Sequence, residues 1–97
     1  MGFDGEFERR LVAEFEADAG AARVVARQAR DLSDSGRFEA DMARALTASV
    51  AVRNLRDAPD ELGLPEKWNW WVGALELAYG GYDQFRVARW ADKSSEP

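Results

Sequence analysis

Three arginines in the N-terminal third of the chain have the type and spacing to contact phosphate. Arg23, Arg27 and Arg30 share one side of a helix wound at about 100° per residue. Guanidinium groups on one helix face neutralise phosphates in nucleic-acid-binding proteins, and Arg37 would extend the patch. The chain as a whole has a formal net charge of -5, which repels a polyanion at long range. A dimeric nucleic-acid-binding regulator is therefore the alternative hypothesis, against the simpler interpretation of a solvated helix face.

Residues that commonly carry catalysis or bind metal are scarce in this chain. It contains no Cys and no His, so a thiolate nucleophile, an imidazole base and the common zinc ligands are all missing. Glu14 and Asp18 could meet as a carboxylate pair, but metal sites in helical bundles take ligands from several helices. Gly80 and Gly81 follow a predicted helix and lack the spacing of a phosphate-binding loop. We expect no enzymatic activity, no cofactor and no metal site.

The most distinctive feature is the tetrapeptide Trp-Asn-Trp-Trp at residues 68–71, inside a predicted helix over 65–79. One face of that helix would carry five large side chains, namely Trp68, Trp71, Val72, Leu75 and Tyr79. The opposite face would carry Trp70, Ala74 and Leu77, and a narrow polar strip of Asn69 and Glu76 would separate the two. A helix that is apolar on two faces either crosses the middle of a bundle or offers one face to another molecule.

The face with Trp70, Ala74 and Leu77 needs a cover, because removing one tryptophan from water contributes about 4 to 6 kcal/mol. The chain itself could provide it if Phe85, Val87 and Trp90 folded back across the two glycines onto Trp70. A second molecule could provide it instead, as a symmetric homodimer or as a partner's helix. We predict a non-catalytic protein-interaction module that self-associates or binds a protein partner. Its predicted contact residues are Trp70, Ala74, Leu77 and, at the rim, Trp90.

The N-terminal half of the chain is predicted to form two helices. Apolar residues keep one helical stripe from Phe3 to Leu32, which indicates a single long helix. If that helix breaks, it should break near Gly20, and Asp18 would then cap a second segment. Small polar residues at 33–36 end it. The second helix runs from 37 to 56 and stops before Pro59.

The C-terminal half is predicted to begin with a short helical turn over 57–65 that Gly63 closes. Pro65 then starts the tryptophan helix. Residues 82–90 fit either a short helix or an edge strand, and we favour the helix. The fold expected is all-α, a small antiparallel bundle of three main helices plus a short C-terminal fourth element.

Composition agrees with a single folded domain. The chain has 97 residues, of which 46% are apolar and 32% are charged, as in ordinary soluble globular proteins. We expect one helical domain over 1–92 and a disordered polar tail over 93–97. No apolar run is long enough for a membrane span or resembles a secretion signal, so we expect no membrane contact and a cytoplasmic location.

Overall fold

The computed structural model describes residues 3–87, and in this range the regular structure is entirely helical. The elements are α1 (Phe3–Phe15), α2 (Ala19–Ser35), α3 (Arg37–Met42), α4 (Ala48–Leu55), α5 (Leu64–Tyr79) and a 3-10 helix, η1 (Asp83–Phe85). The predicted all-α class is thus confirmed, with more and shorter helices than expected. The predicted tail over 93–97 lies outside the described residues, as does Trp90.

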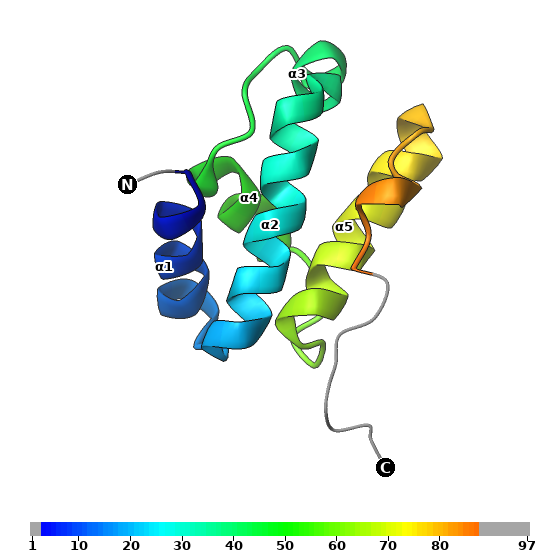
Figure 1. The fold of residues 1–97 in the computed structure, drawn as a ribbon. Helices are drawn as coiled ribbons and strands as arrows, with labels where there is room; N and C mark the ends of the chain where they lie inside the picture. Colours follow the sequence, from blue (N-terminus) through cyan, green and yellow to red (C-terminus); the bar gives the residue numbers. More distant parts are fainter. Residues whose placement is uncertain (1–2, 88–97) are drawn as a thin grey trace.

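The single long helix predicted from Phe3 to Leu32 is wrong, and the chain breaks close to the expected weak point. Glu16 has a φ of 52°, a left-handed conformation that ends α1. Asp18 then caps α2, because its Oδ2 accepts a hydrogen bond from the Ala21 N–H at 3.1 Å. The break lets α1 and α2 pack side by side in opposite directions (Figure 1).

The second helix, predicted over 37–56, is also divided. Ala43 has a φ of 62° and ends α3, and α4 begins only after Thr47, whose Oγ1 accepts from the Val50 N–H at 3.2 Å. Leu46 lies in the intervening loop and is buried in the core. Burial of Leu46 favours the break over continued helix, although alanine at 43 is a strong helix former.

The tryptophan helix begins and ends close to the predicted positions. Residues 57–63, predicted as a short helical turn, form turns that include a hydrogen bond from the Leu62 N–H to the Pro59 oxygen at 3.1 Å. Pro65 lies in the first turn of α5, and Gly80, with a φ of 78°, ends the helix. Among residues 3–87, no helix has the combined length and apolar character needed to span a bilayer.

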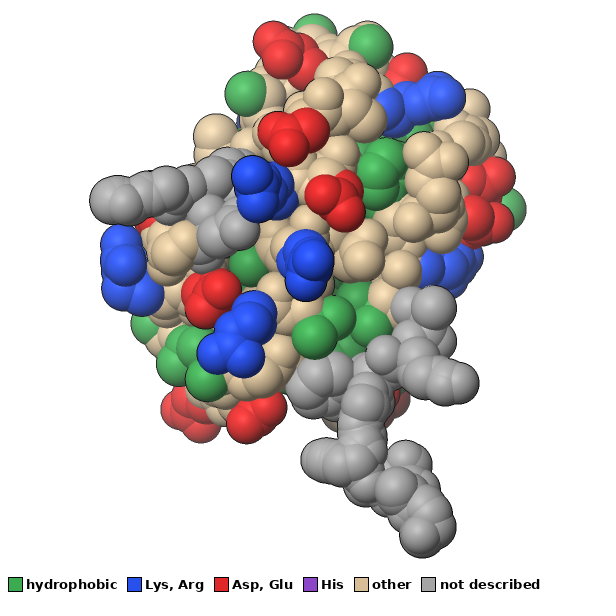
Figure 2. All heavy atoms as spheres, in the orientation of Figure 1, with side chains coloured by type: hydrophobic (Ala, Val, Ile, Leu, Met, Phe, Trp, Pro, Cys, Tyr) green, Lys and Arg blue, Asp and Glu red, His purple; other side chains and the backbone are tan. Residues whose placement is uncertain are grey.

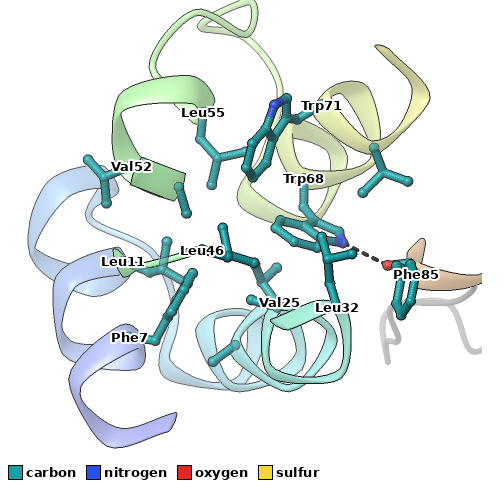
Figure 3. Packing of buried hydrophobic residues seen from close by; sticks show 14 of the residues in the cluster. Phe7, Leu11, Val25, Leu32, Leu46, Val52, Leu55, Trp68, Trp71 and Phe85 are labelled. Carbon is teal, nitrogen blue, oxygen red and sulfur yellow. Dashed lines mark hydrogen bonds between the residues drawn. The ribbon is translucent and has the colours of Figure 1, made fainter. Parts of the chain in front are cut away.

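Helix α2 lies at the centre of the bundle. Its buried side is mostly alanine, as the stripe Ala21, Ala22, Val25, Ala26, Ala29 and Leu32 shows. These short side chains let α1 pack on one side of α2 and α5 on the other (Figure 1). Larger residues from the neighbouring helices, including Phe7, Leu11 and Trp68, fill the remaining space in one continuous core (Figure 3).

Candidate interaction surface on the tryptophan helix

The inner face of α5 is built around two indoles in contact with each other. Trp68 and Trp71 are buried, and their rings meet edge to face, with centroids 5.6 Å apart at 81°. Trp71 makes a similar contact with Phe38 of α3 at 5.7 Å. The Trp68 indole N–H donates to the Phe85 carbonyl oxygen at 2.8 Å (Figure 3). Both indoles therefore belong to the core, as predicted, whereas Tyr79, predicted on the same face, is the last residue of α5 and is exposed.

The polar strip of α5 holds the segment that follows the helix. The Asn69 side chain forms two hydrogen bonds with the main chain of Val87: its Nδ2 donates to the Val87 oxygen at 3.0 Å, and its Oδ1 accepts from the Val87 N–H at 2.8 Å. Two turns beyond Asn69, Glu76 Oε1 accepts from the N–H groups of Tyr82 and Asp83 at 2.7 and 3.0 Å. Sequence reasoning missed this role, although amide and carboxylate groups inside an otherwise apolar helix could have indicated it.

Tyr82 anchors the start of the returning segment. Its ring is fully buried, and its hydroxyl donates to Asp41 Oδ2 at 2.7 Å. Burial, followed by the hydrogen bond to the Asp41 carboxylate, raises the pKa of Tyr82 well above its ordinary value. The Arg37 guanidinium lies over the ring, 5.8 Å from the centroid. Tyr82 thus ties α3 to the end of α5, a role that the sequence did not suggest.

The returning segment follows a different route from the one predicted. Phe85 and Val87 do fold back across the two glycines and are buried, but the backbone groups of both bind Trp68 and Asn69. Packing of this segment on Trp70 was one of the two covers considered, and in the structure Trp70 remains 40% exposed. Trp90, the third residue proposed as a cover, lies outside the described part of the chain.

The outer face of α5, defined here as Trp70, Ala74 and Leu77, is open to solvent. Leu77 is 91% exposed, and Ala74 is exposed between the two larger side chains. The guanidinium of Arg86 lies beside Gly73, with Nη2 3.2 Å from the position that a Cβ would occupy there. Asp83 Oδ1 accepts from Arg86 Nε at 2.8 Å and holds it in this place. The outer face is therefore an apolar ridge that the charged side chains of Arg86 and Asp83 border on one side.

The predicted basic patch is only partly assembled. Arg23, Arg27 and Arg30 are all exposed along α2, and Arg30 Nε lies 3.7 Å from Asp34 Oδ2. Arg37 is placed elsewhere, against Gly81 and the Tyr82 ring. Figure 2 shows acidic side chains among the basic ones on the face of the molecule turned to the viewer. The structure therefore brings together three of the four predicted arginines, in mixed electrostatic surroundings.

The two carboxylates considered as a pair have separate structural roles. Glu14 forms an ion pair with Arg56, which links α1 to the end of α4, and Asp18 caps α2. Within residues 3–87, no group of three or more Asp and Glu side chains is arranged to hold a metal ion. The structure thus gives the two carboxylates different partners.

Comparison with known proteins adds one result. Residues 2–76 match the WNWW domain family, which is most of the chain. The chain belongs to the WNWW domain family. The family name is the one-letter sequence of residues 68–71. This tetrapeptide contains the two buried indoles, Asn69 and the exposed Trp70. No curated protein and no solved structure shows significant similarity to the chain. In this WNWW domain, the matched region ends before the segment that Asn69 and Glu76 hold.

Proposed function

We propose that this WNWW domain is a non-catalytic protein-interaction module that self-associates through the outer face of α5. The observation that carries the proposal is the exposure of Leu77, which at 91% is the most exposed of the large apolar side chains of residues 5–87. Exposed apolar residues are common singly, but here Leu77 and Trp70 lie on one helix face, separated by a small residue. Tryptophan is the residue most enriched in interface hot spots.

A second copy of the chain suits this face because the face matches itself. In an antiparallel pairing about an axis between Gly73 and Ala74, Trp70 of one copy would oppose Leu77 of the partner subunit. Ala74 lies at the crossing, where its small side chain allows two helices to approach closely, and the Arg86 guanidinium beside Gly73 borders the contact. A two-fold symmetric contact requires such self-complementarity.

Charge supports the same arrangement. Glu66 lies in the first turn of α5, and the Arg37 guanidinium lies beside Gly81, just beyond the other end of the helix. The antiparallel pairing brings Glu66 of each copy toward Arg37 of the partner subunit. One helix face is a small interface, so we expect a dissociation constant of roughly micromolar to tens of micromolar.

The test is sedimentation equilibrium of the wild-type chain over a wide dilution range, together with Leu77→Glu and Trp70→Glu. We expect a wild-type dimer that dissociates on dilution, at least tenfold weaker association in both variants, and unchanged helical circular dichroism. Val12→Glu is the matched control, because Val12 is 38% exposed on α1, against 40% for Trp70. A wild-type monomer at every concentration, or an equal effect of Val12→Glu, contradicts the proposal.

A charge exchange tests the orientation of the two helices. Glu66→Arg and Arg37→Glu should each weaken the dimer, and the double variant should recover part of the loss. Recovery in the double variant indicates that the two side chains face each other across the interface. Without recovery, the antiparallel arrangement is wrong even if the dimer forms.

Nucleic-acid binding by the face of Arg23, Arg27 and Arg30 is the alternative. All three side chains are exposed, which supports it, and the position of Arg37 away from them weakens it. A labelled duplex should bind at low ionic strength and dissociate steeply as salt increases, with a loss of affinity in Arg27→Ala. Absence of binding at low salt excludes this function.

A further inference from the structure

We propose that α5 carries a peptide-binding site at Trp68, Asn69 and Glu76, and that residues 82–87 are a ligand segment held there in cis. The ligand class is an extended peptide with an aromatic residue followed two positions later by a branched aliphatic residue. This site is separate from the outer face of α5, so it does not depend on self-association.

The side chains of α5 recognise the main chain of the segment. Asn69 binds both the N–H and the carbonyl oxygen of Val87, at 2.8 and 3.0 Å, and Trp68 donates to the Phe85 carbonyl oxygen at 2.8 Å. Between them, Arg86 is extended, with φ -71° and ψ 153°. Every extended peptide offers the same groups, so these hydrogen bonds contribute affinity without selecting a sequence.

Selectivity would come from the side chains that alternate with these contacts. Phe85 and Val87 are both 6% exposed, whereas Arg86 between them is exposed. Tyr82 fills a third buried position and adds the hydrogen bond to Asp41. Residues 83–85 form the 3-10 helix η1, so the alternation typical of a peptide bound in an extended conformation is confined to Phe85, Arg86 and Val87.

The segment follows the region that the family model matches, although its buried side chains belong to the same hydrophobic core. Trp68, Asn69 and Glu76 lie inside the region matched by the WNWW family, and residues 82–87 follow it. The link consists of Gly80 and Gly81, with φ values of 78° and 87° that other residues rarely adopt. The binding groups thus belong to the family domain and the bound segment does not, which is why we infer that another peptide can replace it.

The test uses the full chain with Phe85→Asp and Val87→Asp together, which should release the segment. The probe is a fluorescein-labelled synthetic peptide with the sequence of residues 81–87, and binding is followed by fluorescence anisotropy. We expect at least tenfold tighter binding to the released variant than to the wild type, no binding of a scrambled peptide, and loss of binding when Asn69→Leu is added. Gln84→Asp is the matched control, because Gln84 is exposed in the same segment.

Each outcome decides the proposal. A released variant that keeps its helical circular dichroism and does not bind the peptide overturns it, as does equal binding to wild type and variant. If the variant unfolds, restoration of helical signal and cooperative melting by added peptide supports the proposal. An unfolded variant that the peptide does not restore shows that residues 82–87 are an integral part of the core.

Discussion

Trp68 and Trp70 are two residues apart on the same helix and lie in opposite environments. The Trp68 ring is fully buried, and its N–H is bonded to the Phe85 carbonyl, whereas Trp70 is 40% exposed on the outer face. The same residue type therefore stabilises the fold at one position and is available to another molecule at the other. Substitutions on the inner face of α5 should therefore affect folding, whereas substitutions on the outer face should affect self-association.

The largest effect on folding is expected from Trp68→Ala. The variant loses a buried indole, creates a cavity and leaves the Phe85 carbonyl without its donor, so the free energy of unfolding should fall by about 3 to 5 kcal/mol. Urea denaturation followed by circular dichroism measures the loss. Trp70→Ala, measured at concentrations where the chain is monomeric, should lose less than about 1 kcal/mol. Equal losses in the two variants would remove the distinction between the faces.

A smaller loss of stability is expected from Asn69→Ala. Removal of the two hydrogen bonds to Val87 should reduce the free energy of unfolding by about 1 to 3 kcal/mol. Hydrogen exchange should localise the effect, with faster exchange of the Val87 amide. Asn54→Ala is the matched control, because Asn54 forms a single bond to its own helix, from Nδ2 to the Val50 oxygen at 2.8 Å. An unchanged Val87 exchange rate would show that Asn69 does not hold the segment.

Tyr82→Phe should have a smaller effect that depends on pH. At neutral pH, loss of the hydroxyl bond to Asp41 should cost about 1 to 2 kcal/mol. The pKa of Tyr82 is raised in the folded state, so above about pH 10 the unfolded chain loses this proton while the folded chain retains it. The wild type should therefore lose stability as pH rises through this range. The phenylalanine variant lacks this decline. The difference in the free energy of unfolding between wild type and variant should therefore narrow as pH rises.

Unfolding titrations at several pH values from 8 to 11 measure this gap. Tyr79→Phe is the control, because that ring is exposed and the structure gives its hydroxyl no comparable buried partner among the described contacts. A gap between wild type and Tyr82→Phe that stays constant with pH would contradict the burial of an un-ionised Tyr82.

The smallest effect on folding is expected from Leu77→Gln. The side chain is 91% exposed, so the free energy of unfolding of the monomer should change by less than about 0.5 kcal/mol. Thermal melting at high dilution checks this value. A clear loss of monomer stability would mean that Leu77 packs on its own chain, and the outer face would then be part of the core.

Helical periodicity was sufficient to predict the buried side of α5 and the class of the fold. It placed Trp68 and Trp71 in the core because a regular repeat depends only on local geometry. It predicted one unbroken helix from Phe3 to Leu32, whereas the local chemistry of Gly20 indicated the weak point and that of Asp18 the cap expected if the helix broke. Periodicity failed at Ala43, since a left-handed alanine is unfavourable locally and the break that it makes is favoured by the burial of Leu46, a tertiary contact.

The contacts of Asn69 and Glu76 in the polar strip could not be predicted either, because they too depend on tertiary structure. Asn69 and Val87 are far apart in sequence, and their contact depends on the path of the chain after Gly80 and Gly81. The outer face, by contrast, was predicted from the same periodicity that gave the inner one. What the sequence left open was whether the last segment of the chain or a second molecule would cover this outer face.

The alanines of α2 restrict how this domain can change during evolution. Ala22, Ala26 and Ala29 are completely buried in a helix that α1 and α5 flank on both sides. Each added methylene at these positions must push a neighbouring helix away, because packed cores have little spare volume. Substitutions should therefore accumulate on the flanking helices, while α2 retains small residues and sets the spacing to which its neighbours adapt.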